Sequence, residues 1–174
     1  MANAAADAPR PLIVRIRNWV GDVVLGLPAL RLLQAQGYAL HIVARGSWAP
    51  SLLAAYGWPV HVQTKALNAK VQQLRDIASQ CAKQDASFKR RDNALLLPVS
   101  FSSALEMRLA GLRAVGVAKE GRTLILARAV PWCDQGHELE RYWDVACRFL
   151  GRQQAAPAEI DFQVAPAEIG RAHV

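Results

Sequence analysis

The segment at residues 15–24, RIRNWVGDVV, carries the side chains best suited to chemistry. It begins at the end of a short apolar run, PLIVRI at residues 11–16, which is typical of a strand buried in a parallel sheet. Ligands of open α/β sheets bind in the crevice beyond the carboxyl ends of the strands, and Gly21 permits close approach of the backbone there. Asp22 would then lie at the entrance of the first helix and face the crevice, with Arg17 nearby on the same loop.

The residue types alone leave two interpretations of Asp22 open. In the first, the carboxylate faces the crevice and takes part in acid–base chemistry. In the second, Asp22 is an N-cap, which accepts hydrogen bonds from free backbone N–H groups at the start of the following helix and complements the helix dipole. Only a longer sequence pattern or a structure distinguishes the two.

Other catalytic and binding motifs are absent from the sequence. No GxGxxG follows the first predicted strand, and neither a P-loop nor GxSxG nor HExxH occurs. The cysteines are odd in number and form no CxxC pair, which indicates neither a disulfide framework nor a zinc site. The histidines lie on separate predicted elements without metal-ligand spacing: His41, His61, His137 and His173. The sequence therefore predicts no cofactor and no bound metal.

Composition and charge indicate the class of the protein. The chain has 174 residues, of which 52% are hydrophobic and 20% charged, so one domain with a packed core is expected and an ordinary disordered chain is excluded. The net charge of +7 suits an anionic partner: a phosphorylated sugar, a nucleotide, an acidic membrane surface or nucleic acid. No nucleic-acid-reading motif accompanies the charge, so nucleic acid is not the predicted partner.

Strands alternate with helices along most of the chain, and this alternation positions the candidate residues. Buried strands are predicted at residues 11–16, 40–44, 60–62, 93–99, 114–117 and 123–127. Helices are predicted from Gly21 to a C-cap at Gly37, with a kink at Pro28, and at residues 65–83, 103–110 and 137–150. The fold class is therefore α/β, with a Rossmann-like parallel sheet covered by helices on both faces.

The two ends of the chain differ in composition from this domain. Residues 1–10 are predicted to be a disordered leader without the features of a signal peptide, and no segment is predicted to span a membrane. From Gly151 the sequence GRQQAAPAEIDFQVAPAE has too little apolar content for a core of its own and is typical of a linker. The scattered cysteines favour a reducing cytosol as the compartment.

Three longer segments carry a resemblance to a known family. They are RIRNWVGDVVLGLPALRLLQ at residues 15–34, LPVSFSSAL at residues 97–105 followed by LAGL, and HELERY at residues 137–142. In this order they resemble the family 9 glycosyltransferases, the heptosyltransferases that build the inner core of lipopolysaccharide. The NWVGD string is most similar to the enzymes that add the second heptose, that is, to heptosyltransferase II.

The resemblance implies the N-terminal half of a GT-B glycosyltransferase, a fold in which two Rossmann-like domains face each other. The first domain, here residues 11–151, holds the acceptor lipid, and the second holds the ADP-heptose donor. Asp22 occupies the position of the general base, which removes the proton of the acceptor hydroxyl as it attacks the anomeric carbon, with inversion and without a metal. The expected substrate-binding residues are Arg17, Gly21, Ser100, Ser102 and Ser103.

Several of these residues have a structural alternative. The three serines either line the crevice or act as turn and N-cap residues of the following helix. The family frequently has Lys or Arg at the position of Ser102, so for this sequence the resemblance does not imply a basic contact from that loop to the acceptor. One further set of cations either meets lipid phosphates and the anionic inner membrane or belongs to a solvated loop: Lys83, Lys89, Arg90 and Arg91.

The resemblance also implies a longer complete enzyme with a second domain. Residues 152–174 are then a truncated interdomain linker, with an artefactual tail, EIGRAHV, at residues 168–174. ADP-heptose would bind mainly to the second domain, the acceptor would be Kdo-bearing lipid A at the cytoplasmic face of the inner membrane, and this chain alone would be inactive. The alternative is a stand-alone Rossmann-like module that binds a nucleotide or an anionic sugar, with Asp22 as a helix cap.

Overall fold

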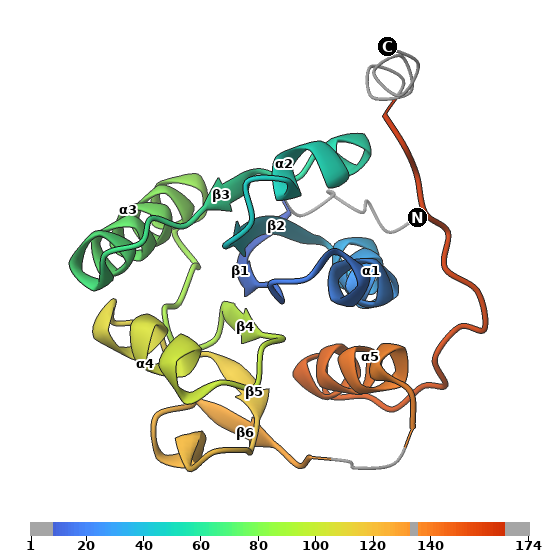
Figure 1. Ribbon diagram of the computed structural model, residues 1–174. Helices are drawn as coiled ribbons and strands as arrows, with labels where there is room; N and C mark the ends of the chain where they lie inside the picture. Colours follow the sequence, from blue (N-terminus) through green and yellow to red (C-terminus); the bar gives the residue numbers. More distant parts are fainter. Residues whose placement is uncertain (1–8, 133–135, 166–174) are drawn as a thin grey trace, which may run out of the picture.

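The computed structural model describes residues 9–132 and 136–165, which form a parallel sheet between two layers of helices (Figure 1). The strands are β1 (Arg10–Arg15), β2 (Tyr38–Ala44), β3 (Val60–Val62), β4 (Ala94–Leu96), β5 (Val115–Val117) and β6 (Arg128–Val130). The helices are α1 (Val20–Ala35), α2 (Ala49–Leu52), α3 (Leu67–Gln84), α4 (Phe101–Leu109) and α5 (Glu138–Phe149), with 3-10 turns η1 (Ala54–Tyr56) and η2 (Arg122–Leu124). The predicted α/β, Rossmann-like fold is confirmed.

The strand order places a topological switch point at β1. The order is β3-β2-β1-β4-β5-β6, with every pairing parallel. The chain therefore continues to one side of β1 through β2 and β3, and returns to the other side through β4. In sheets of this type the ligand crevice lies outside the carboxyl ends of the strands at the switch point. The loops after β1 and β4 are thus the expected place of a site.

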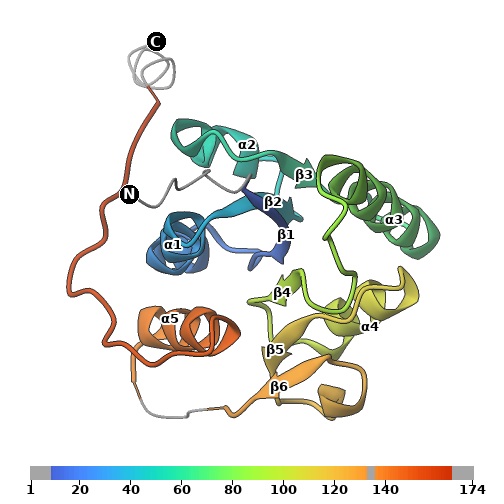
Figure 2. The same ribbon diagram turned by 180° about the vertical axis from the view of Figure 1, so that it is seen from behind.

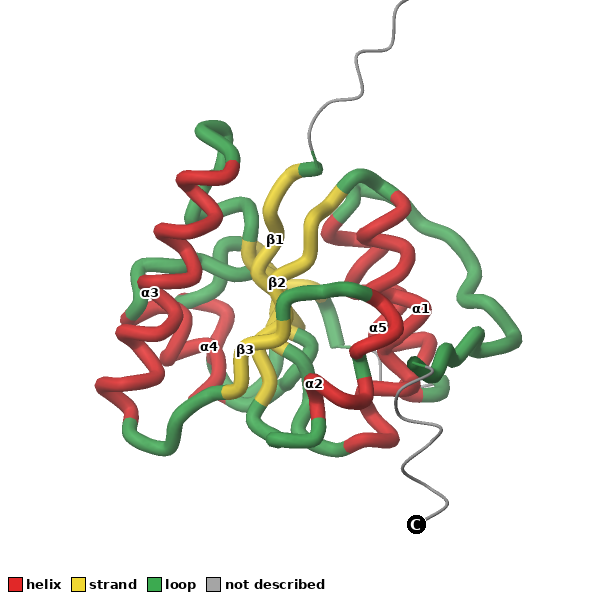
Figure 3. The backbone as a smooth tube through the Cα atoms, turned by 90° about the horizontal axis from the view of Figure 1, so that it is seen from above, coloured by secondary structure: helices red, strands yellow, loops and turns green. Residues whose placement is uncertain are grey.

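The two faces of the sheet have separate hydrophobic cores. Successive residues of a strand point to opposite faces, so Leu12 and Val14 of β1 pack in one cluster with α1 and α5, whereas Ile13 packs in another with α3 and α4. Figures 1 and 2 show these helix pairs from the front and the back, and Figure 3 shows the sheet between them. The cluster on the face with α1 and α5 also includes Ala49 of α2, and it is the larger of the two.

The first predicted helix is present, but its C-cap is Gln36 and not Gly37. α1 contains Pro28 and ends just before Gly37, whose φ of 80° is the left-handed conformation that glycine adopts without strain. The other predicted helices correspond to α3, α4 and α5, and a short helix, α2, forms in the connection after β2. Within the described part of the chain, none of the helices combines the length and the apolar character needed to cross a membrane.

The predicted strand at residues 123–127 is wrong. These residues lie in and after η2, and the strand β6 follows them. Leu124 is 88% exposed, so the apolar sequence there does not mark a buried strand. Gly121, with a φ of 72°, turns the chain before η2, and the Ala127 N–H then bonds to the Ala114 carbonyl at 2.9 Å. The pairing of β6 with β5 follows directly, so the strand begins at Arg128 and not at residue 123.

The amino-terminal strand begins slightly earlier than expected. Arg10 already pairs with Tyr38 of β2, so the last residue of the predicted leader belongs to β1. Pro9 is described but belongs to no strand, and residues 1–8 of the predicted leader lie outside the described residues.

The segment at residues 152–165 has no helix or strand and runs along α5 and α1 toward α2 (Figure 1). Asp161 forms an ion pair with Arg31 of α1, and its carbonyl accepts a hydrogen bond from the Tyr56 hydroxyl at 3.4 Å. These contacts attach the segment to the domain surface. The predicted tail at residues 168–174 lies outside the described residues.

Candidate active site

Asp22 lies in the first turn of α1, at the carboxyl end of β1. The N-cap position is occupied by Trp19 in extended backbone, with a φ of −106° and a ψ of 140°, and its side chain makes no capping hydrogen bond. The interpretation of Asp22 as an N-cap is therefore wrong, although its charge complements the positive end of the helix dipole. The Asp22 side chain is 18% exposed, so its carboxylate remains accessible from solvent.

Two side chains from distant parts of the sequence hold the Asp22 carboxylate. Arg17 Nε donates to Oδ2 at 3.3 Å, and the Tyr142 hydroxyl donates to Oδ1 at 3.2 Å. Arg17 belongs to the loop between β1 and α1, whereas Tyr142 comes from α5, which packs against α1. Each carboxylate oxygen therefore has a donor that fixes its orientation.

Tyr142 is the residue of this site that the sequence analysis missed. Burial raises the pKa of its hydroxyl far above the ordinary value; Arg17 opposes this shift, and Asp22 and Glu138 add to it. The phenol therefore stays protonated at neutral pH and acts as a donor to Asp22. The periodicity of α5 placed this residue only on a core-facing stripe, and the one available signal was its position at the end of the HELERY motif.

The start of α5, which carries Tyr142, is fixed by a capping box. The His137 imidazole accepts a hydrogen bond from the Leu139 N–H at 3.3 Å, and the Glu140 carboxylate accepts one from the His137 N–H at 2.8 Å. Such reciprocal bonds satisfy backbone donors that a helix leaves free at its amino end. The cap determines the residue at which α5 begins and therefore the position of Tyr142 along the helix that packs against α1.

Gly21 leaves the backbone beside Asp22 open. A Cβ atom added at this position would have no heavy atom within 4 Å, apart from the adjoining chain and the helix backbone. The flanking side chains project outward, with Trp19 77% exposed and Val20 46% exposed. The backbone at Gly21 is therefore not covered by side chains from other elements.

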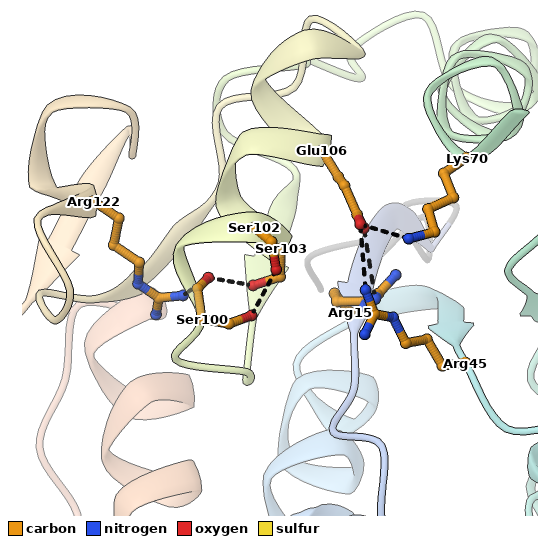
Figure 4. A network of polar contacts seen from close by, with 8 residues as sticks. All are labelled: Arg15, Arg45, Lys70, Ser100, Ser102, Ser103, Glu106 and Arg122. Carbon is orange, nitrogen blue, oxygen red and sulfur yellow. Dashed lines mark hydrogen bonds and ion pairs between the residues drawn. The ribbon is translucent and has the colours of Figure 1, made fainter. Parts of the chain in front are cut away.

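The three predicted serines occupy the start of α4 and differ in exposure (Figure 4). Ser100 is the N-cap residue, and Ser102 is exposed with its hydroxyl 3.4 Å from the Ser100 hydroxyl. Ser103 is only 3% exposed, and its hydroxyl donates to the Ser100 carbonyl at 2.8 Å. Ser103 therefore has the turn role that the sequence left open, while Ser100 and Ser102 remain nearer the surface.

Arg122 reaches the loop between β4 and α4 from the side and bonds to its backbone (Figure 4). Its side chain is fully buried and donates to three carbonyls: Val117 at 2.6 Å, Pro98 at 2.7 Å and Ser100 at 3.3 Å. Burial lowers the pKa of Arg122 to about 10, so it is still a cation at neutral pH. Nothing in the sequence indicates this role, because arginine is rarely fully buried.

The basic residues proposed to meet a membrane lie far from Asp22 in the topology. Lys83 is in the last turn of α3, and Lys89, Arg90 and Arg91 precede β4, so all four lie at the amino edge of the sheet. Arg90 is engaged by the Ala110 carbonyl at 3.3 Å. A lipid phosphate bound by these residues would therefore face away from the crevice.

Among the described residues, no three His, Cys, Asp or Glu side chains gather in a way that would hold a metal ion. The groups that contact the Asp22 carboxylate are one arginine and one protonated tyrosine.

Comparisons with known proteins relate this geometry to solved structures. No model of a protein family matches the chain, and a search of curated protein sequences also finds no match. E. coli ADP-heptose lipopolysaccharide heptosyltransferase II superimposes with a TM-score of 0.65 and 23% identity, over 92% of this chain and 49% of that one.

Two structures of the E. coli heptosyltransferase WaaC match as well, each at 20% identity and over 51% of the WaaC chain. The complex with ADP gives a TM-score of 0.63 over 88% of this chain, and the complex with ADP-2-deoxy-2-fluoro heptose gives 0.59 over 87%. The chain therefore spans about half the length of the solved structures it matches. It has the Rossmann-like fold of one half of a GT-B heptosyltransferase.

Proposed function

We propose that this chain is the N-terminal, acceptor-binding half of an inverting heptosyltransferase and that Asp22 is its general base. The observation that carries the proposal is the state of the Asp22 carboxylate. It lies at the switch point of the sheet, is partly exposed, and is oriented by Arg17 and Tyr142 instead of capping α1. The fold shared with half of two heptosyltransferases supplies the reaction class.

The proposed reaction needs one proton acceptor on this half. A sugar hydroxyl of the acceptor attacks the anomeric carbon of the donor, the bond from that carbon to the ADP leaving group breaks, and the hydroxyl proton passes to Asp22. A positioned carboxylate of this kind contributes a rate factor of about 10²–10⁴. Tyr142 and Arg17 keep the carboxylate from rotating, and the remaining guanidinium edge of Arg17 is available to a carboxylate or phosphate of the acceptor.

The partners follow from the same proposal. The donor is ADP-heptose, held mainly by a second domain, in line with the ADP and ADP-heptose analogue in the WaaC structures. The acceptor is Kdo-bearing lipid A, which places the enzyme in the cytoplasm against the inner membrane. This chain alone is expected to transfer no heptose, because most donor contacts belong to the other domain.

Acceptor binding tests the proposal on the chain itself. Purified chain should bind Kdo-bearing lipid A in detergent more tightly than lipid A without Kdo. Arg17→Ala should weaken binding about tenfold, because a charge-assisted contact is lost, whereas Arg91→Ala, at the amino edge of the sheet, should not. Equal loss with both variants would indicate attraction by net charge alone. Binding of nucleotides or free anionic sugars in place of the lipid would favour the stand-alone module.

A further inference from the structure

A second group of charges, here called the Glu106 cluster, lies on the opposite face of the sheet from Asp22 (Figure 4). The Glu106 carboxylate meets three cations. Lys70 Nζ is 2.9 Å and Arg45 Nη2 is 3.4 Å from Oε1, and Arg15 Nη2 is 3.6 Å from Oε2. The proposed heptosyl transfer does not use this cluster.

Four different elements bring the cluster together at the carboxyl edge of the sheet. Arg15 is the last residue of β1, and Arg45 directly follows β2. Lys70 is in the first turn of α3, and Glu106 is in the middle of α4. The group therefore borders the same edge at which sheets of this type bind their ligands, on the side covered by α3 and α4.

The cluster has more positive charge than its own carboxylate can offset. Three cations and one anion give 3 − 1 = +2, and the charges that act on the pKa of Arg15 are those of Glu106 and Arg45. Burial lowers the pKa of Arg15 to about 10, which still leaves it charged at neutral pH. Buried charges are costly unless they are paired, so an arrangement with this excess favours an additional anion.

Polar atoms in the cluster are also without hydrogen-bond partners. Arg15 is 3% exposed, and its Nε atom is buried with no acceptor; Glu106 is 4% exposed, and its Oε2 atom is buried with no donor within hydrogen-bond distance. Glu106 thus reaches Arg15 only by a long ion pair. The single carboxylate attracts all three cations but leaves the Arg15 Nε–H without a hydrogen-bond acceptor.

We propose that the Glu106 cluster is a binding site for a phosphate monoester. Arg45, whose side chain is 43% exposed, is the part of the cluster that solvent reaches most, whereas the Lys70 side chain is 12% exposed. A monoester brings a charge of about −1.5 to −2 at neutral pH and three acceptor oxygens, which offsets most or all of the excess of +2. Arginine presents a planar fork that bonds two phosphate oxygens at once, and lysine adds a point charge.

The charge excess distinguishes between phosphate classes. A phosphate diester, such as the backbone of an ordinary phospholipid, carries one negative charge and would leave the cluster positively charged. A monoester on a sugar or on a lipid headgroup would neutralise it. The proposal does not depend on heptosyl transfer, since it concerns other side chains and a different chemical group.

Titration of the full chain with small phosphates tests the site. The probes are inorganic phosphate, glycerol 3-phosphate and the diester dimethyl phosphate, followed by backbone amide NMR shifts at constant ionic strength. We expect saturable shifts around Arg45 and Lys70, with the two dianionic probes binding at least fivefold more tightly than the diester. Equal binding of monoester and diester, or shifts spread over all basic residues, would overturn the proposal.

Two variants sharpen the test. Arg45→Gln should weaken phosphate binding about fivefold without loss of fold, because Arg45 is the most exposed cation of the cluster; Arg91→Gln is the matched control and should have no effect. Glu106→Gln removes the internal competitor and should tighten binding. Weaker binding by a folded Glu106→Gln variant would contradict the proposal, and the Arg45 variant remains decisive if Glu106→Gln does not fold.

Discussion

Two carboxylates lie at the same edge of the sheet and on opposite faces, and their neighbours suit them to different work. Asp22 has one cation and one neutral hydroxyl as partners and keeps 18% of its side chain exposed. Glu106 has three cations as partners, and its side chain is 5% exposed. A carboxylate with few, well-oriented partners and open access suits proton transfer, whereas one enclosed by cations suits the binding of charge.

The comparison also shows how each group depends on the fold. Arg17 and Asp22 are five residues apart, so the helix start alone brings them near each other. The partners of Glu106 come from three other elements and are 36 or more residues away. The Asp22 carboxylate is partly exposed, so water can replace a lost partner, whereas the loss of a partner of Glu106 leaves a buried charge unpaired.

The largest effect is expected from Asp22→Asn in a complete transferase. Such an enzyme can be built by joining this chain to the donor-binding half of E. coli heptosyltransferase II. The kcat for heptose transfer should fall by about 10²–10⁴ because the amide cannot accept the proton, with the thermal unfolding midpoint unchanged. Asp76→Asn, at an exposed site on α3, is the control. An Asp22→Asn chimera that retains full activity would remove Asp22 from the mechanism.

Glu106→Ala should reverse the pattern, with a large effect on stability. The substitution leaves three cations around an empty position, and breaking a buried ion pair from one side costs about 3–5 kcal/mol. Urea denaturation should show this loss in the free energy of unfolding. Glu138→Ala, which removes a partly exposed partner of Arg141, should cost about 1 kcal/mol or less. Similar losses for both variants would mean that the Glu106 cluster is not buried as described.

Tyr142→Phe separates orientation from packing at the Asp22 site. The ring remains in the core, and only the hydroxyl that donates to Asp22 is lost, which should cost about 1 kcal/mol of stability. In the chimera, kcat should fall several-fold while KM for the acceptor stays constant, because the base is less well oriented. Tyr56→Phe, whose hydroxyl instead contacts the segment at residues 152–165, should leave kcat unchanged. A change in KM alone would assign Tyr142 to acceptor binding.

Local patterns predicted most of the fold because they depend on neighbouring residues. The apolar run before Arg15, the glycine at residue 37 and the stripe of α5 each follow from short-range rules of strands, caps and helices. The LIL sequence at residues 124–126 failed for the same reason: its apolar character suggested a strand, but Gly121 and the buried Arg122 turn the chain there.

The candidate site was predictable only in part. The sequence pattern placed Asp22 and Arg17 at the crevice, and the structure brings them into contact. The bond from Tyr142 spans 120 positions of the sequence, and the Glu106 cluster joins four elements. Side-chain contacts of this range depend on how the helices pack on the sheet, which periodicity does not specify.

The smallest expected effect is a pH dependence on the face that carries the Glu106 cluster. His41 of β2 and His61 of β3 stack there with Nδ1 and Nε2 3.4 Å apart, and His41 also contacts Gln84 of α3 at 3.0 Å. Burial, and then the neighbouring His41, lower the pKa of His61 below its ordinary 6.5. Between the lowered pKa and 6.5 the unfolded chain therefore binds more protons than the folded one.

Stability from this pair is thus fully present above pH 6.5 and declines as the pH falls toward the lowered pKa of His61. Urea denaturation at a series of pH values between 7.5 and 5 should show the decline, and His61→Gln should reduce it because the glutamine does not titrate. His137→Gln, on the opposite side at the start of α5, shows how much of the decline comes instead from the imidazole of the capping box. If His61→Gln retains the whole pH dependence, the acid sensitivity lies elsewhere, and the face with α3 and α4 would then be distinguished from the Asp22 face by its fixed charges alone.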